Sequence, residues 1–258
     1  MVGAAPGPHP ESEHRVLPVR MRVWDLPTRL FHWALVACIL SACISARGLD
    51  EQALRLHFFS GYAVLTLVGF RVLWGFAGSQ YARFSQFVRG PLATVRYVLL
   101  LLRGRLDAGG SQVGHNPLGA ASVLALLAVS AALAISGLFA KDYVANEGPL
   151  ARFVSEKMVD RSSTLHAWGE PLLYTLVALH VSAIVYYRLA HGQNLLGPML
   201  TGNKLLRAKG ACEQAGRAHL AKPNVDADEL APDAAGGNAR ALVLLGFSAA
   251  LVAYLVRL

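Results

Sequence analysis

The chain has few cysteines and few charged side chains for its 258 residues. Its three cysteines, Cys38, Cys43 and Cys212, are too few for a disulfide framework, and two of them lie within one apolar run. Charged residues make up only 16%, against about 25% in an average soluble domain. Because 54% of the residues are hydrophobic, a soluble fold of this size cannot bury all of its apolar surface. The composition therefore predicts an integral membrane protein.

Five stretches have little or no charge and are long enough to cross a membrane. A helix that spans a hydrocarbon core of about 30 Å needs about 20 apolar residues. The predicted spans are Leu30–Ala46, Leu56–Phe76, Pro117–Ala140, Leu165 to about Ala190, and Ala241–Val256. Arg71 interrupts the second span, and Glu170 and Pro171 mark a candidate break near the start of the fourth. We predict an all-α integral membrane protein with a four-helix transmembrane bundle and a fifth, C-terminal transmembrane helix.

The excess of basic residues, 24 Lys and Arg against 16 Asp and Glu, lies mainly in alternate loops. Fifteen basic residues lie before the first span, between the second and third, or after the fourth, whereas the other loops are balanced in charge. Because cytoplasmic loops carry the excess of Lys and Arg, this pattern predicts a cytoplasmic N-terminus. It also accounts for the net charge of +8 without a nucleic-acid partner.

The chain divides into four predicted segments. They are a flexible cytoplasmic tail (1–20), the four-helix domain (21–200), a cytoplasmic linker (201–238) and the additional transmembrane helix (239–258). Pro91–Arg103 is apolar but too short to span, so we predict a helix on the cytoplasmic membrane surface. The long leader and a histidine within the first apolar run argue against a cleaved signal peptide.

Four of the nine histidines, His32, His57, His166 and His180, lie inside the predicted spans. An ionisable side chain within the bilayer is costly and usually functional. His166 and His180 are 14 residues apart, so on one helix they face nearly the same way and lie about 21 Å apart along the axis. The predicted topology places His57 level with His166 and His32 level with His180.

Two facing imidazoles at one depth can ligate one metal ion from opposite sides. Iron in a porphyrin has two axial positions open, whereas zinc needs about four protein ligands, and no carboxylate or thiolate lies at either level. Gly61, Gly69 and Gly169 could leave space for a flat macrocycle, although close helix packing is the alternative for each glycine. The pattern predicts one iron porphyrin between each pair of histidines.

Arg71 and His115 lie near the predicted inner pair. Arg71 is 14 residues after His57 and thus on the same helix face, and no acidic residue is expected at its depth. We predict a haem propionate as its counter-charge, the alternative being that Arg71 extends to the cytoplasmic surface. His115 borders either the inner haem, a ligand pocket or the membrane interface. Asn116 and Pro117 predict the N-cap and first residue of a helix.

Four motifs carry a resemblance to a known family. They are Leu30–Trp33, Leu56–Tyr62, Gly114–Gly119, and Leu165–Glu170 followed by His180. Over about residues 20–200 the chain resembles the bacterial cytochrome b561 family, which includes the b-type cytochrome subunits of nickel–iron hydrogenases. The resemblance implies a four-helix bundle in the inner membrane with two b-type haems and quinone as electron partner. It implies His32, His57, His166 and His180 as axial ligands. The region from about 203 onward departs from the usual four-helix pattern.

Two imidazoles on each iron leave no open axial position, so such a centre is suited to one-electron transfer. We expect transfer between the membrane quinone pool and a periplasmic partner: a c-type cytochrome, a hydrogenase subunit or a small reductant such as superoxide. Whether the chain is itself a quinone oxidoreductase stays open. One alternative is a non-redox transporter that binds a divalent metal, which needs acidic or thiolate ligands and discontinuous helices. Another is an anchor subunit that docks a partner through residues 203–238.

Overall fold

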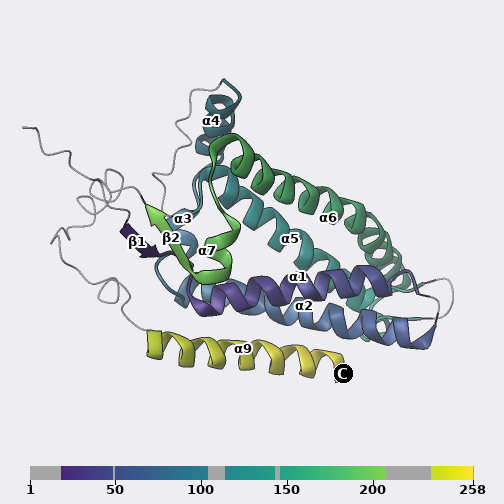
Figure 1. Cartoon of the computed structure of the whole chain (residues 1–258). Coiled ribbons are helices and arrows are strands. Elements are labelled where there is room, and N and C mark those ends of the chain that lie inside the picture. The colour runs from purple at the N-terminus through teal and green to yellow at the C-terminus, as the bar shows by residue number, and fades with distance from the viewer. Residues whose placement is uncertain (1–18, 49, 104–113, 143–145, 207–233, 258) are drawn as a thin grey trace, which may run out of the picture.

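The computed structural model describes residues 19–48, 50–103, 114–142, 146–206 and 234–257. Long helices lie roughly side by side, with small elements gathered at one end (Figure 1). The elements are β1 (Val19–Arg22), α1 (Leu26–Ser45), α2 (Glu51–Ala77), α3 (Phe84–Phe87), α4 (Pro91–Leu102), α5 (Pro117–Phe139), η1 (Ala151–Phe153), α6 (Glu156–His191), α7 (Leu196–Thr201), β2 (Asn203–Leu206) and α9 (Ala234–Arg257). We call the end with β1, β2 and α7 the sheet end, and the end with the α1–α2 and α5–α6 connections the loop end.

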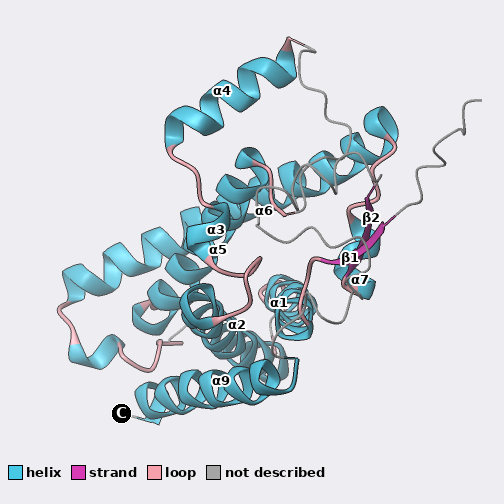
Figure 2. Ribbon diagram, turned by 90° about the vertical axis from the view of Figure 1, so that its left-hand side faces the viewer, coloured by secondary structure: helices cyan, strands magenta, loops and turns pink. Residues whose placement is uncertain are grey.

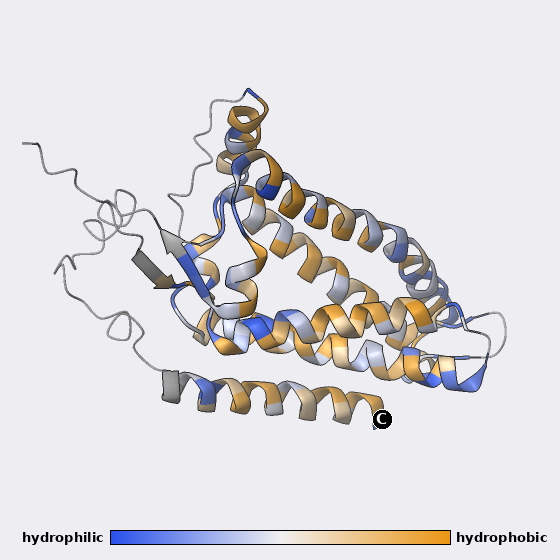
Figure 3. Ribbon diagram, viewed as in Figure 1, coloured by the Kyte–Doolittle hydropathy of each residue, from blue (hydrophilic) through white to orange (hydrophobic). Residues whose placement is uncertain are grey.

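Helices α1, α2, α5, α6 and α9 are long and apolar enough to cross a membrane, which confirms the five predicted spans. Apolar residues line their lengths, and polar residues gather at the two ends of the bundle (Figure 3). Helices α1 and α2 begin earlier than their uncharged runs because caps determine their first residues. Asp25 accepts a hydrogen bond from Thr28 N at 2.7 Å, and Asp50 accepts one from Ala53 N at 2.6 Å.

Helix α6 is continuous from Glu156 to His191, so the candidate break at Glu170 and Pro171 does not occur. Proline removes one backbone donor from a helix interior, and packing can retain the helix in spite of that loss. Helix α6 ends at Gly192, whose positive φ of 63° is favourable for glycine. The unbroken helix places His166 and His180 on one rigid element.

Neighbouring helices pack in the order α1, α2, α5 and α6, while α1 and α6 do not pack against each other along their lengths. Figure 2 shows α1 and α2 beside each other, with α5 and α6 extending behind them and α4 to one side. The buried core lies largely on α2, where Val64, Val68, Phe70 and Trp74 meet Phe31 of α1. Helices α1 and α2, which carry the predicted partners of the two α6 histidines, therefore share one core.

Helix α9 lies against α2, on the outside of the other four long helices (Figures 1 and 2). Ser248 Oγ donates to Thr66 O at 2.8 Å, and Arg240 Nη1 donates to Ala77 O at 3.1 Å. A Cβ added to Gly69 would collide with Ser248 Oγ. Gly69 therefore allows α9 to approach α2, and the packing interpretation of this glycine is the right one.

The sheet end contains strands that the sequence did not predict. Strand β1 pairs antiparallel with β2, with Val19 opposite Leu206 and Arg22 opposite Asn203. Strand β1 thus begins inside the expected tail, β2 lies inside the expected linker, and α9 begins before the expected last segment. Residues 1–18 and 207–233, which make up most of the tail and linker, lie outside the described residues. Helix α4 confirms the helix expected near Pro91–Arg103, and its position on the membrane surface stays a prediction.

Candidate haem-binding sites

The structure brings His57 of α2 and His166 of α6 together near the loop end. Their ring centroids lie 6.0 Å apart, and the ring planes are nearly perpendicular, at 84°. A metal–imidazole bond is about 2.0 Å long, so two imidazoles on opposite sides of one ion have centroids about 6 Å apart. The observed separation therefore suits a single metal ion between the rings.

Backbone carbonyls of the other two helices orient these rings. His57 Nδ1 lies 3.0 Å from Ala42 O of α1, and His166 Nδ1 lies 2.9 Å from Leu133 O of α5. Ser136 Oγ is a further neighbour, 3.4 Å from His166 Nδ1. When Nδ1–H donates to a carbonyl, the lone pair of Nε2 is available to a metal. Four helices thus contribute a ring or a carbonyl beside a ring, and ligation through Nε2 stays a prediction.

The glycines near this pair have different roles. Nothing lies within 4 Å of the place where a Cβ of Gly61 would be, so there is open space one turn from the ligand candidate on α2. The corresponding place at Gly169 meets the side chain of Leu133, which indicates close helix packing. Gly137, which the sequence reasoning missed, leaves room for the ring of His166, since its Cβ would be 3.0 Å from Cε1. Of the three predicted glycines, Gly61 alone has nothing close to the place of its missing Cβ, and its role beside a macrocycle stays a prediction.

His32 of α1 and His180 of α6 form the second pair, toward the sheet end. They lie near enough for their charges to interact. His180 Nδ1 is 3.4 Å from Ser122 Oγ of α5, and His32 Nδ1 is buried without a hydrogen-bond partner among the described residues. Burying a polar atom without a hydrogen-bond partner costs free energy. A ligand or hydrogen-bonding group at His32 Nδ1 would remove this cost. The 14-residue spacing separates the two pairs by about 21 Å along α6.

Arg71 is buried at the sheet end, with 3% of its surface exposed, and does not extend to the surface. Its Nη2 donates to Ala82 O at 3.0 Å, and its guanidinium carbon lies 4.9 Å from the centroid of the Phe84 ring. Nη1 is buried without a partner among the described residues. The expectation that no acidic residue lies near is wrong, because Asp25, the N-cap of α1, interacts electrostatically with Arg71. An anionic group could still bind Nη1.

His115 is enclosed by aromatic rings and does not lie exposed at the interface. Its ring centroid is 4.7 Å from that of Trp24 and 4.7 Å from that of Phe87. Burial, together with the nearby charges of Arg71 and His180, lowers the pKa of His115 to about 4. The imidazole is therefore neutral at neutral pH. Its proximity to these two residues places it beside the second pair.

Comparison with known proteins identifies the family. A family model described as prokaryotic cytochrome b561 matches residues 23–202, which is most of the chain. This chain belongs to the prokaryotic cytochrome b561 family. Its five long apolar helices agree with a multi-pass membrane protein of this family. The matched region ends at Gly202, so α9 lies outside it.

Two curated relatives of this cytochrome are the probable Ni/Fe-hydrogenase 1 B-type cytochrome subunits of Escherichia coli strain K12 and of Escherichia coli O157:H7. Each is 22% identical over 139 residues, which cover 45% of this chain and 57% of the relative. The chain therefore spans little more than half the length of the curated relatives it matches. No solved structure matches the chain.

The cytochrome also contains a polar cluster that the sequence reasoning missed. Tyr187 OH of α6 accepts a hydrogen bond from Asn116 Nδ2 at 3.0 Å and lies 3.0 Å from Tyr97 OH of α4. Asn116 Oδ1 accepts from Gly119 N at 2.6 Å, which confirms the predicted N-cap before Pro117. No local signal marked the two tyrosines, because only the fold brings α4 to the end of α6.

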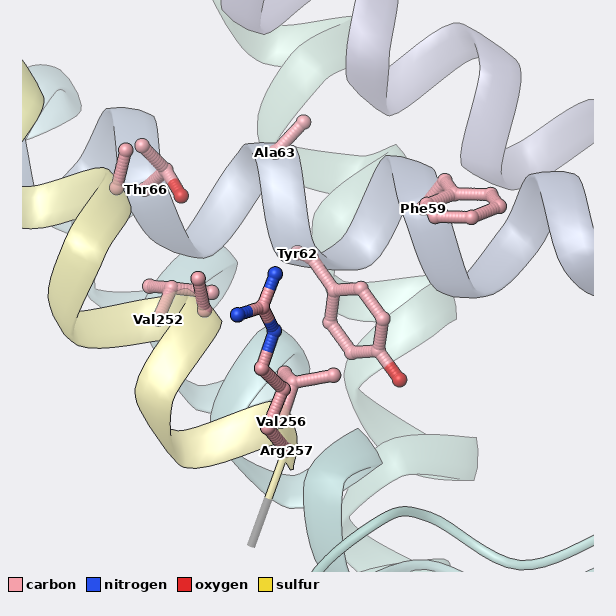
Figure 4. A pocket seen from close by; sticks show the side chains of 9 residues that line it. Phe59, Tyr62, Ala63, Thr66, Val252, Val256 and Arg257 are labelled. Carbon is pink, nitrogen blue, oxygen red and sulfur yellow. The ribbon is translucent and has the colours of Figure 1, made fainter.

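A cavity of about 290 Å³ lies between α2 and α9. In Figure 4, Tyr62 and Thr66 of α2 line one side, and Val252 and Arg257 of α9 line the other. At 3.6 residues per turn these α2 residues are on the face opposite His57. The cavity therefore lies apart from both histidine pairs.

The described residues contain no group of three or more His, Cys, Asp or Glu side chains that could hold a metal ion. A structural zinc site uses about four such donors. The four histidines of the spans lie instead in two pairs, His57 with His166 and His32 with His180.

Proposed function

We propose that this cytochrome b561-family protein carries electrons across the membrane through two b-type haems. His57 and His166 hold one, and His32 and His180 hold the other. The observation that carries the proposal is the 6.0 Å separation of the His57 and His166 rings, with each Nδ1 directed at a backbone carbonyl. A bis-imidazole haem supplies reversible one-electron transfer without an open axial position.

The protein side chains hold and adjust these centres. Gly61 leaves open space beside the first pair. Arg71 Nη1 is available to a haem propionate at the second pair, where a charge-assisted hydrogen bond would be strong because the site is buried. The buried, neutral ring of His115 lies beside the second pair and adds no charge there. Because the two pairs are about 21 Å apart along α6, together they cover most of the hydrocarbon core.

We further infer quinone as the electron partner in the membrane and a periplasmic redox protein as the second partner. The matched relatives are named as hydrogenase cytochrome subunits, which supports a hydrogenase subunit as that protein. A c-type cytochrome and a small reductant such as superoxide are the other candidates. The excess of basic residues supports a cytoplasmic N-terminus, in which case the sheet end faces the cytoplasm.

The proposal is tested on the purified full-length protein by a dithionite-reduced minus oxidised visible spectrum and by the ratio of haem to protein. We expect two haems per chain and a sharp α-band. His57→Ala and His32→Ala should each remove one haem and retain much of the other. His14→Ala is the matched control, because His14 lies outside the predicted spans. A colourless protein, or a wild type that binds a single haem after supplementation with haemin, would contradict the proposal.

A further inference from the structure

Helix α1 contacts α7 at the sheet end, and the residue that follows α1 contacts α6 at the loop end. At the sheet end, Trp33 Nε1 donates to Met199 O of α7 at 3.3 Å, and Arg29 Nη1 donates to Leu200 O at 2.5 Å. At the loop end, Arg47, which follows α1, reaches Glu170 of α6. Between these contacts, helices α1 and α6 do not pack against each other. The Arg47–Glu170 contact therefore closes the bundle beside the first histidine pair.

Three side chains form this closure. Arg47 Nη2 lies 2.5 Å from Glu170 Oε1 and donates to Tyr174 OH at 3.1 Å. Tyr174 OH donates to the same carboxylate oxygen at 2.6 Å. The exposed fractions of the Arg47 and Glu170 side chains are 66% and 39% in the protein alone. An exposed ion pair contributes little to stability, so stability is a weak reason for this arrangement.

Glu170 lies close to His166 of the first pair. It lies four residues after His166 on α6, which places the two side chains one turn apart on one helix face. The charges of Glu170 and His166 are close enough to interact. Where lipid and protein replace water, such an interaction is screened less. A carboxylate at this position opposes addition of an electron to a metal ligated by His166, and the guanidinium of Arg47 offsets that effect.

We propose that Glu170 and Arg47 act as an opposed pair of charges that sets the reduction potential of the haem held by His57 and His166. The inference rests on the proposed function, since it requires a haem at that pair. The two residues tune the centre through space and are not ligands. Because their charges cancel, removing either one alone shifts the potential, and the two shifts have opposite signs.

Potentiometric titration of the purified haem-loaded protein tests the inference. Glu170→Gln leaves the cation and should raise the potential of this haem, whereas Arg47→Gln leaves the carboxylate and should lower it. We expect at least a threefold change in the ratio of reduced to oxidised haem at a fixed applied potential, which is about 30 mV for one electron. The double variant should return close to the wild-type potential. The haem at His32 and His180 serves as an internal reference in every sample.

Charge-retaining variants and a second ion pair provide the controls. Glu170→Asp and Arg47→Lys keep both charges and should shift the potential least, even where geometry changes. Lys141 and Glu147 form an ion pair of the same 2.5 Å length and of similar exposure, outside the long helices. Lys141→Gln and Glu147→Gln make the same changes in net charge, and we expect small shifts because water screens this pair.

Several results would overturn the inference. They are shifts of the same sign in both single variants, no shift in either, or a double variant that does not return toward the wild type. Loss of the haem from all neutral variants and also from the charge-retaining ones would indicate that Arg47 and Glu170 only hold the helices together. A wild-type protein that binds no haem at His57 and His166 would instead refute the proposed function. The two failures are therefore distinguishable.

Discussion

At the scale of single residues, backbone carbonyls and a glycine shape the surroundings of the first histidine pair. The rings of His57 and His166 are oriented by the carbonyls of Ala42 and Leu133, which any residue type could supply. Gly61 contributes by leaving space. Substitutions that alter space or burial near the ligand candidates should therefore change haem binding as clearly as loss of a ligand.

We expect Gly61→Leu to remove the haem at His57 and His166 while the second haem is retained. The added side chain would fill the open space one turn from His57. Haem per chain, measured from the reduced spectrum, should fall from two toward one. Gly246→Leu is the matched control, because Gly246 is also a helical glycine with nothing near its missing Cβ but lies on α9. Equal haem content in both variants would contradict this assignment.

His115 should make the protein less stable in mild acid. Its pKa is about 4 when folded, against an ordinary value of 6.5, so the unfolded chain binds more protons between these values. Stability is therefore full above pH 6.5 and falls as the pH is lowered toward 4, by on the order of 3 kcal/mol from this group. His115→Phe should remove that part of the pH dependence in thermal unfolding measured in detergent. Parallel curves for the two proteins across pH 6.5 to 4 would argue against it.

At the scale of elements, α6 organises both sites and α9 supports them from outside. An unbroken α6 sets the distance between His166 and His180, while partners on α1 and α2 complete the pairs. Helix α9 contacts α2 on the face away from His57, through Ser248 and its neighbours. Loss of α9 packing should therefore affect stability more than haem content.

We expect Gly69→Val to lower the melting temperature while both haems remain bound. The new side chain would collide with Ser248 Oγ and push α9 away from α2. Overpacking of this kind typically costs about 1–3 kcal/mol. Adding Ser248→Gly to Gly69→Val should restore part of the lost stability, because it removes the colliding atom. Loss of haem from the single variant would show that α9 helps to shape a haem site.

At the scale of the whole molecule, the two ends of the bundle differ in structure and charge. The sheet end gathers β1, β2, α3, α4 and α7, and the loop end has the shorter connections (Figure 1). Among the described residues, the sheet end has basic side chains such as Arg22, Arg83, Arg89 and Lys204, whereas acidic residues accompany the basic ones at the loop end. This asymmetry is what the positive-inside rule uses to set the orientation of a membrane protein.

The orientation can be measured with reporter fusions. Alkaline phosphatase folds into an active enzyme only when it is exported, so a fusion after Glu147, in the α5–α6 connection, should be active. A fusion after Gly90, between α3 and α4, should be inactive. Fluorescent-protein fusions at the same two positions should show the opposite pattern and control for expression. Activity at Gly90 and none at Glu147 would reverse the proposed topology.

Local patterns in the sequence predicted much of this architecture. Uncharged runs predicted five spans, Asn116 and Pro117 predicted the start of α5, and the 14-residue spacing placed His166 and His180 on one face. Each of these depends on short-range physics, namely apolar length, capping and helical periodicity. The same reasoning left a break at Pro171 open, because the effect of a proline on a helix depends on its neighbours as well as on the residue itself.

Other features depended on contacts between segments far apart in the chain. The β1–β2 pairing joins residues 19–22 to 203–206, Asp25 lies near Arg71, and Arg47 reaches Glu170 across 123 positions. No periodicity or cap marks such pairs, because each partner is an ordinary residue in its own segment.

The amino-acid order by itself predicted which segments can span a membrane and the levels of the four histidines in them, since hydrophobic length and helix rise are local properties. Only the tertiary structure decided which carbonyls orient the rings, which glycine has open space beside it and which charges surround each pair. Those properties depend on how separate helices approach one another, and packing of the whole bundle sets that approach.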